Sequence, residues 1–166
     1  MSVRVRRAGE EDVPAIAALA RELRLHQGDS PDQITTETLL RDGFGSDPQF
    51  RAMVAELDGA IVGYALFHDS YEPAHAARGV YLCDLFVGSH ARRRGVGTAL
   101  VAAVAQDARS RRRSFVWWVS RGWNSEAHAF YATLAAFEEP VMAHAVAFAS
   151  FDRLSRAARD PADEAG

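Results

Sequence analysis

Three consecutive arginines followed by a Gly-x-Gly are the residues whose spacing most clearly suggests chemistry. They occupy Arg92 to Gly97, between the apolar run GVYLCDLFV and an alanine-rich segment of helical periodicity. A strand that turns directly into a helix leaves backbone N–H groups unpaired at the helix N-terminus, where the helix dipole also favours an anion. Glycines allow close backbone approach, and arginines add charge-assisted hydrogen bonds. The segment is therefore either a phosphate or pyrophosphate site or a tight turn with a solvated basic rim.

A second motif lies downstream of the glycine segment, and the two motifs together indicate a protein family. The glycine segment is not a G-x-x-x-x-G-K-[ST] loop, and Leu100 breaks the pattern G-x-G-x-x-G, but the segment fits [Q/R]-x-x-G-x-[G/A]. Downstream, WNSEAHAFYATLAAF spans Trp123 to Phe137 and fits W-N-x-x-[AS]-x-x-F-Y. With these two motifs the chain resembles the GCN5-related N-acetyltransferases (GNAT). The runs LLRDGFGSDPQFRAMVAE and YLCDLFV are similar to the diamine (spermidine/spermine) acetyltransferase branch.

The resemblance covers residues 3–158 and implies a fold. That fold is α/β (α+β), with a central mixed, mostly antiparallel twisted sheet of about six to seven strands flanked by helices on both faces. We expect residues 1–158 to form a single acetyltransferase domain and the acidic residues 159–166 to form a mobile tail. Ala135 stands where the family prefers glycine.

The resemblance also implies a reaction, in which an acetyl group passes from acetyl-CoA to a primary amine by direct attack. The amine would belong to a small molecule that is diamine-like, polyamine-like or amino-acid-like. Backbone N–H groups on a splayed strand can bind the pantetheine amides and the thioester oxygen as negative charge develops on it. The cofactor-binding residues implied in this way are Leu85, Phe86, Val87, Arg92, Arg93, Arg94, Gly95, Val96, Gly97, Thr98, Asn124, Ala127, Phe130 and Tyr131.

Two residues of the second motif carry alternative interpretations. Tyr131 is the predicted acid that protonates the departing CoA thiolate, or else a core aromatic beside Phe130. Asn124 hydrogen-bonds the cofactor, caps the helix that begins at Ser125, or does both.

Removing a proton from the amine is the harder step, because an alkylamine of pKa about 10.4 is only about one part in a thousand neutral at pH 7. In the diamine branch a glutamate often precedes the aspartate of this strand, but here that position is Cys83. Asp84 remains as a predicted catalytic residue that orients water or holds the ammonium, or it is a structural carboxylate. Cys83 is either a nucleophile or, as we prefer, a plain strand residue.

The acceptor end of the site is less well defined. His26 and Gln27 follow the first predicted helix and are, with Cys83 and Asp84, the predicted substrate contacts. His26 is a base or a histidine at the solvent edge. Further partners for ammonium groups could come from Asp29, Asp32, Tyr71 and Glu72.

The elements that must position these residues follow from periodicity and turn signals. We expect strands over residues 3–6, 50–57, 60–67, 79–87, 114–120 and 144–150, with a hairpin at Asp58-Gly59 and a close approach at Gly63. A first helix is expected to begin near the acidic residues 10–12. Further helices are expected over residues 35–45, 95–109 and 125–135, and a short one after residue 150. Trp117 and Trp118 should point to opposite faces of one strand.

Composition narrows the class of protein. The chain has 166 residues, a formal charge of −3 and one cysteine, which together indicate a single globular protein without a disulfide framework or a cysteine metal cluster. We expect a cytoplasmic homodimer that binds neither nucleic acid nor membrane, with the arginines of residues 109–114 solvated at a helix C-terminus. The alternatives are a non-catalytic acyl-CoA-binding regulatory domain and an arginine-patch nucleic-acid module.

Overall fold

The computed structural model describes residues 3–134 and 137–157. The chain forms two compact units, Met1–Gly122 and Trp123–Gly166, which are considered separately. The predicted C-terminal tail at residues 159–166 and the family's glycine position at Ala135 lie outside the described residues.

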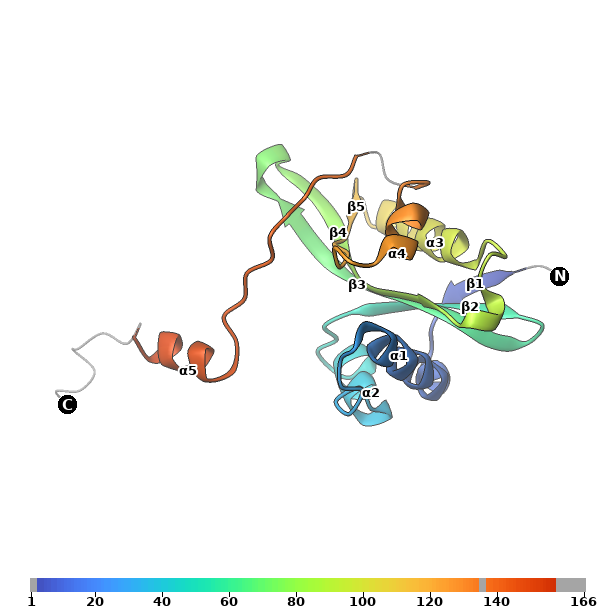
Figure 1. The fold of residues 1–166 in the computed structure, drawn as a ribbon, viewed down its shortest axis with the longest axis horizontal. Coiled ribbons are helices and arrows are strands. Elements are labelled where there is room, and N and C mark those ends of the chain that lie inside the picture. Colours follow the sequence, from blue (N-terminus) through green and yellow to red (C-terminus); the bar gives the residue numbers. More distant parts are fainter. Residues whose placement is uncertain (1–2, 135–136, 158–166) are drawn as a thin grey trace. The chain divides into compact units, whose positions relative to one another are not determined.

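The first unit is a five-stranded sheet with helices on both faces (Figure 1). The strand order is β1-β2-β3-β4-β5; the pairs from β1 to β4 are antiparallel, and β4 pairs with β5 in parallel. Helices α1 and α2 cover one face of the sheet and α3 covers the other. The elements are β1 (Arg4–Arg7), η1 (Glu10–Asp12), α1 (Val13–Gln27), α2 (Thr36–Phe44), β2 (Arg51–Leu57), β3 (Ala60–Glu72), η2 (Pro73–His75), β4 (Ala77–Val87), η3 (Ser89–Ala91), α3 (Val96–Ser110) and β5 (Val116–Trp117).

The mixed, mostly antiparallel sheet is confirmed, but the described residues form five strands rather than six or seven. The second unit contains α4 (Ser125–Tyr131) and α5 (Phe148–Ala157). The strand predicted over residues 144–150 is wrong: residues 138–147 are extended chain without regular structure, and α5 begins at Phe148. A β-branched, apolar run becomes a strand only when a neighbouring strand accepts its backbone hydrogen bonds, and no described strand does so here.

Local turn chemistry sets the central hairpin. Asp58 and Gly59 have φ of 53° and 82°, the left-handed pair that a two-residue hairpin turn requires. The turn places Leu57 opposite Ala60 and so fixes the register between β2 and β3.

Each face of the sheet has its own apolar core. On one face α1 and α2 pack on the sheet around Ile16, Val54 and Tyr64; on the other, α3 packs through Leu100 and Val104. Trp118 packs against the α3 core, whereas Trp117 contacts the ring of Tyr81, so the two tryptophans do lie on opposite faces.

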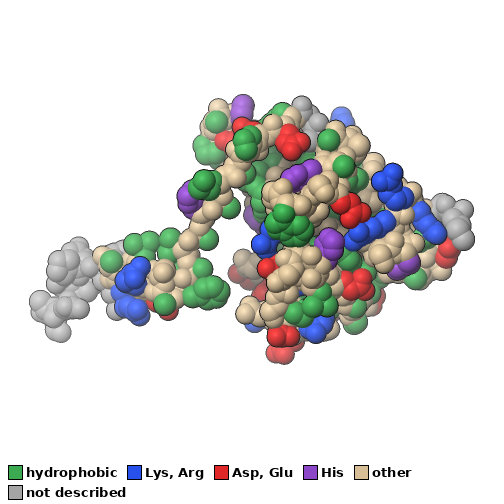
Figure 2. Space-filling view, in the orientation of Figure 1, with side chains coloured by type: hydrophobic (Ala, Val, Ile, Leu, Met, Phe, Trp, Pro, Cys, Tyr) green, Lys and Arg blue, Asp and Glu red, His purple; other side chains and the backbone are tan. Residues whose placement is uncertain are grey.

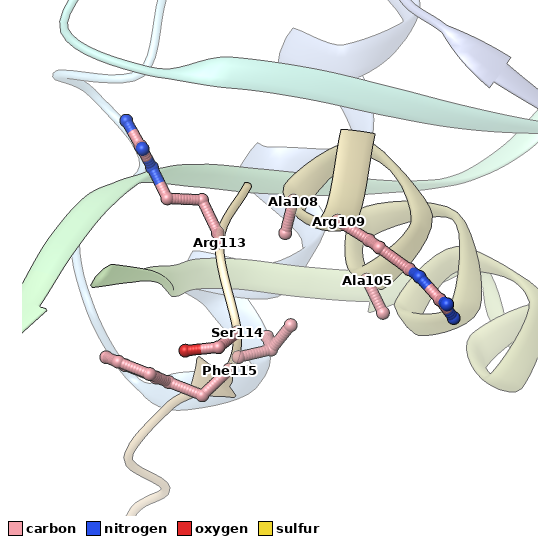
Figure 3. A pocket seen from close by; sticks show the side chains of 7 residues that line it. Ala105, Ala108, Arg109, Arg113, Ser114 and Phe115 are labelled. Carbon is pink, nitrogen blue, oxygen red and sulfur yellow. The ribbon is translucent and has the colours of Figure 1, made fainter. Parts of the chain in front are cut away.

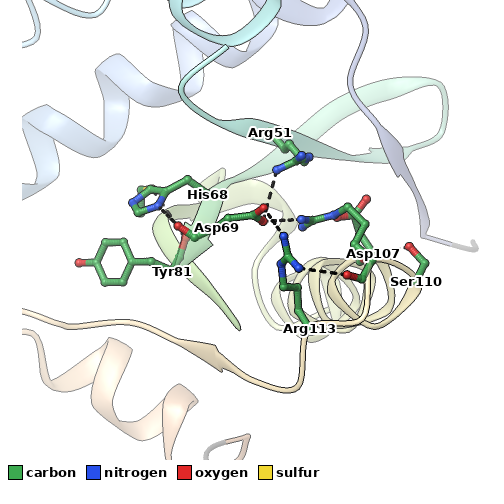
Figure 4. A network of polar contacts seen from close by, with 9 residues as sticks. Arg51, His68, Asp69, Tyr81, Asp107, Ser110 and Arg113 are labelled. Atoms are coloured by element: carbon green, nitrogen blue, oxygen red, sulfur yellow. Dashed lines mark hydrogen bonds and ion pairs between the residues drawn. The ribbon is translucent and has the colours of Figure 1, made fainter. Parts of the chain in front are cut away.

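The carboxylate of Asp69, on β3, binds arginines from β2 and from the segment that follows α3 (Figure 4). Asp69 accepts a hydrogen bond from Arg113 at 2.7 Å, a second from Arg111, and a longer contact of 3.5 Å from Arg51 on β2. Arg111 also donates to Asp107 at 2.8 Å. The hydrogen bonds from Arg113 and Arg111 lower the pKa of the Asp69 carboxyl to about 2. This network joins the C-terminal end of α3 to the sheet.

The predicted solvated arginines after α3 are therefore only partly right. Arg109 and Arg112 are exposed, but Arg111 and Arg113 are half-buried and ion-paired. Two of the four arginines of the basic run are thus structural and bind β3.

Gly63 lies where β3 approaches the end of β4, as predicted from its place inside a strand. A Cβ added there would sit 2.9 Å from the carbonyl oxygen of Phe86 and 3.3 Å from side-chain atoms of Leu100 and Val87. The last residues of β4 can therefore approach β3 only because Gly63 has no side chain.

We predict that Gly63→Ala lowers the free energy of unfolding by about 1–3 kcal/mol, because the added methyl group overpacks the contact with β4. Urea titration measures the change. Gly122→Ala is the matched control, since a Cβ at Gly122 would meet nothing within 4 Å. Equal stability of both variants would contradict the close approach.

Candidate functional site

Strands β4 and β5 separate after two residue pairs, and the candidate site lies where this pairing stops. The β3–β4 ladder runs to Val87, whereas the β4–β5 ladder holds only Val80 opposite Val116 and Tyr81 opposite Trp117. In an antiparallel ladder alternate backbone groups point away from the partner strand. Along Leu82–Val87 these groups face the gap that β5 has left. The predicted pantetheine-binding residues Leu85, Phe86 and Val87 lie along this edge.

A β-bulge falls at the start of the separated edge. Leu66 pairs with Asp84 and Phe67 with Leu82, so Cys83 is the extra residue of β4. Bulges re-aim neighbouring side chains, and here the Cys83 side chain is exposed. The predicted substrate residue Cys83 therefore does lie at the surface of the gap.

The glycine turn places open N–H groups next to this edge. Gly95 is the N-cap of α3 with φ of 78°, and Arg93 also has a left-handed φ of 62°. Ala99 makes the first helical hydrogen bond, to the Gly95 carbonyl at 3.0 Å, so the N–H groups of residues 96–98 lie at the open helix end. Arg93, Arg94 and Thr98 are exposed there. These groups fit a phosphate or pyrophosphate.

Arg92 has a different environment from its two neighbours. Its Nε donates to the Val87 carbonyl at 3.2 Å, and its guanidinium lies 5.8 Å from the centre of the Phe86 ring. The side chain therefore ties the turn to the end of β4. Of the three arginines, Arg93 and Arg94 present their side chains to solvent.

Asp84 is held by two partners on the α1 face of the sheet. Nη2 of Arg24, from α1, contacts both carboxylate oxygens, and the Tyr64 hydroxyl donates to Oδ2 at 3.1 Å. Burial of Tyr64 and then the charge of Asp84 raise the pKa of the Tyr64 phenol well above its usual value. Burial alone would lower the pKa of Arg24, but Asp84 raises it overall. Each carboxylate oxygen therefore accepts at least one hydrogen bond, which suits the structural alternative for Asp84, and its catalytic role stays a prediction.

Arg24 and Tyr64 were not singled out from the sequence. The burial of Arg24 could have been predicted, because it lies four residues after Ala20 on the buried face of α1. A buried arginine needs an ion-pair partner. The partner itself could not be found, because Asp84 is 60 residues away along the chain.

The remaining residues predicted to contact the acceptor do not all lie near Asp84. His26 is exposed, while Gln27 is half-buried and its Oε1 has no hydrogen-bond partner among the described residues. Asp29 pairs with Arg121 at 2.7 Å. Tyr71 and Glu72 lie at the far end of β3, where Tyr71 is opposite Arg78, and so are not near Asp84.

The surroundings of Cys83 disfavour the ionised form of its thiol. Partial burial of the sulfur, and then the adjacent Asp84 carboxylate, raise the pKa of the Cys83 thiol to about 11. Its Sγ faces the Tyr81 carbonyl at 3.8 Å. A nucleophilic cysteine requires the opposite shift, so the geometry favours the plain strand residue.

In the second unit α4 holds the residues of the other motif. Oδ1 of Asn124 accepts from the Ala127 N–H at 3.1 Å, so Asn124 is the N-cap that the sequence allowed. The rings of Phe130 and Tyr131 lie 5.3 Å apart.

Another concave region lies at the opposite end of α3 from the glycine turn (Figure 3). Its lining includes Ala105, Ala108, Arg109, Arg113 and Phe115. It offers no carboxylate, its one hydroxyl, that of Ser114, donates to the Arg78 carbonyl at 3.2 Å, and Arg113 is committed to Asp69. Chemistry is therefore better placed at the β4 edge.

In the described part of the chain, no three or more His, Cys, Asp and Glu side chains are grouped so that they could hold a metal ion. Among the described helices, none is long and apolar enough to cross a membrane.

Comparison with known proteins adds to this geometry. The family model described as Acetyltransferase (GNAT) family matches residues 16–137. Thialysine N-epsilon-acetyltransferase of Mus musculus is 34% identical over 144 residues, which are 81% of this chain and 84% of that protein. Spermidine/spermine N(1)-acetyltransferase-like protein 1 of Homo sapiens is 25% identical over 142 residues, 81% of this chain and 20% of that protein.

A solved structure has the same fold. Integron cassette protein VCH_CASS6, from the mobile metagenome of V. cholerae, superposes with a TM-score of 0.76 at 21% identity, covering 94% of this chain and 99% of the other.

We predict that Cys83 reacts slowly with iodoacetamide. With a pKa of about 11, about one thiol in a thousand is ionised at pH 8, so alkylation should be more than about tenfold slower than for a peptide cysteine of pKa about 8.5. Mass spectrometry follows the reaction at this single cysteine. The rate should still rise between pH 9 and 10 while circular dichroism shows a folded protein; a plateau by pH 9 would contradict the raised pKa.

Proposed function

This chain belongs to the acetyltransferase (GNAT) family and is an acetyl-CoA-dependent N-acetyltransferase, and from this premise we propose how its residues act. We propose that the acceptor is a primary amine of a small molecule, of diamine, polyamine or amino-acid type. The names of the relatives, which refer to thialysine and to spermidine and spermine, support this class of acceptor. The observation that carries the proposal is the open edge of β4 beside the N-terminus of α3.

The cofactor-binding residues are assigned by their place in that geometry. Backbone groups of Leu85–Val87 bind the pantetheine amides, and the N–H groups of residues 93–98 bind the pyrophosphate, with Arg93, Arg94 and Thr98 adding side-chain contacts. Arg92 positions the turn through its bond to Val87. In the second motif, Asn124, Ala127 and Phe130 are proposed as further contacts, with Asn124 also capping α4.

Acetyl-CoA supplies the acetyl group as a thioester, and the chain supplies positioning and charge stabilisation. N–H groups near the bulge of β4 stabilise the negative charge that develops on the carbonyl oxygen during attack. Tyr131 gives its phenolic proton to the leaving sulfur as the C–S bond breaks, and the proton that the acetylated nitrogen loses returns to the phenolate, directly or through solvent. Asp84, held by Arg24 and Tyr64, keeps the bulge and the adjacent strand in place.

A single domain of residues 1–158 is proposed with the same function. The family match runs from residue 16 to residue 137 and so includes parts of both compact units, which supports one acetyltransferase domain.

We further propose a cytoplasmic homodimer that does not bind nucleic acid. Large apolar side chains on α5, Phe148, Phe151 and Leu154, are 86%, 59% and 60% exposed (Figure 2), and a second copy would cover such a surface. The lone free thiol at Cys83 is in keeping with a reducing compartment.

We predict that the purified protein releases free thiol from acetyl-CoA only when an amine is present, and that Tyr131→Phe lowers kcat at least about a hundredfold because the thiolate then leaves unprotonated. CoA binding, measured by calorimetry, should change less than about threefold, since the ring remains. Tyr71→Phe, the same change at an exposed tyrosine, is the control. Unchanged turnover in Tyr131→Phe would remove the assigned acid, and thiol release without dependence on amine would contradict the enzyme.

A further inference from the structure

Three aromatic rings lie side by side on the sheet where β4 and β5 begin to separate. Tyr81 and Trp117 form the last pair of the β4–β5 ladder, with ring centres 4.9 Å apart. The His68 ring lies 5.4 Å from that of Tyr81 on the other side. Trp117 is 44% exposed, and its Nε1 donates to Ser70 at 3.2 Å, which fixes the ring. We call Trp117, Tyr81 and His68 the aromatic wall.

The aromatic wall adjoins the bulge at which the acceptor is proposed to react. Tyr81 precedes Cys83 by two residues, and the Cys83 Sγ contacts its carbonyl oxygen. Burial raises the pKa of the Tyr81 phenol, and the nearby Asp84 carboxylate, with the thiolate form of Cys83 at high pH, raises it further. A molecule that presents its amine at the bulge therefore has the wall beside it.

Four charged groups linked to the Asp84 end of the site are paired with one another. Asp84 is bound by Arg24, and Asp29, which is close enough to Arg24 to affect its pKa, is bound by Arg121. These two aspartates and two arginines sum to zero charge. A second ammonium group on an acceptor would thus meet no unpaired carboxylate among these groups, and Cys83 adds none.

A neutral lining also helps the reaction. An unpaired carboxylate would bind the ammonium but raise the pKa of the amine, whereas an apolar, uncharged lining lowers it and favours the neutral form that attacks. A neutral Cys83 in place of a glutamate is then compatible with catalysis, because desolvation lowers the pKa of the amine and so makes more of it neutral without a carboxylate base.

Resting on the proposed acetyl transfer to a small primary amine, but departing from the diamine and polyamine members of that class, we propose that the preferred acceptor has a single ammonium group on a short chain and a flat apolar body, which stacks on Trp117 and Tyr81. Aromatic rings prefer to pack on one another in an offset or tilted arrangement, so an aromatic acceptor suits the rings of Trp117 and Tyr81. The specificity-determining residue is Trp117, because it is the exposed ring of the wall.

The experiment compares phenethylamine and tryptamine with putrescine and spermidine, by thiol release and by calorimetric binding to the CoA-saturated protein. We expect kcat/KM and affinity to be about tenfold higher for the arylalkylamines. Trp117→Ala should lower both values about tenfold for the arylalkylamines and less than about twofold for putrescine. Trp117→Phe should retain most of the preference, and Tyr71→Ala, which removes another exposed ring of β3, should change nothing.

The inference is overturned if putrescine or spermidine is preferred, or if Trp117→Ala weakens all amines equally while its melting temperature stays near that of the wild type. If no amine supports thiol release, the proposed function fails, and the binding measurement still decides the inference: tighter, Trp117-dependent binding of tryptamine supports it, and equal binding of all four amines overturns it.

Discussion

Strand β4 pairs with a strand on each side at Val80 and Tyr81 but with β3 alone from Leu82 onward, and the candidate site depends on that change. The ladder to β5 ends at Tyr81, whereas the ladder to β3 continues from Leu82 to Val87. Backbone groups in a protein interior normally find partners, so an edge kept open inside a sheet is a binding surface for amides. The bulge at Cys83 begins this edge, and the N-terminus of α3 lies beyond its other end.

The two faces of the sheet keep this edge in place by different means. On one face, α1 is fixed to β4 by the contact of Arg24 with Asp84, which also engages the buried Tyr64. On the other, α3 packs through Leu100 and Val104, and its C-terminal end is clasped to β3 through Asp69. Because Asp84 is paired with Arg24, the proposed mechanism depends on positioning, stabilisation of developing charge and desolvation rather than on a strong base.

Features specified by neighbouring residues were predictable from the sequence. The left-handed pair Asp58-Gly59, the cap at Gly95 and the opposite faces of Trp117 and Trp118 follow from local φ preferences and the two-residue period of strands. Contacts between residues far apart in the sequence were not predictable in this way. Arg24 meets Asp84, and Arg113 meets Asp69, across 60 and 44 residues respectively, and no local pattern encodes such pairs. The strand predicted over residues 144–150 failed for a related reason, because strand formation depends on a partner that the segment itself does not supply.

Amide hydrogen exchange with and without CoA tests the central claim most directly, since it reads backbone groups rather than turnover. The account predicts that CoA slows exchange in peptides covering residues 82–87 and 93–98, where the open edge and the glycine turn lie, and leaves residues 51–57 of the interior strand β2 unchanged. Slowing confined to residues 105–116, around the hollow at the other end of α3, or no slowing along residues 82–87, would contradict it.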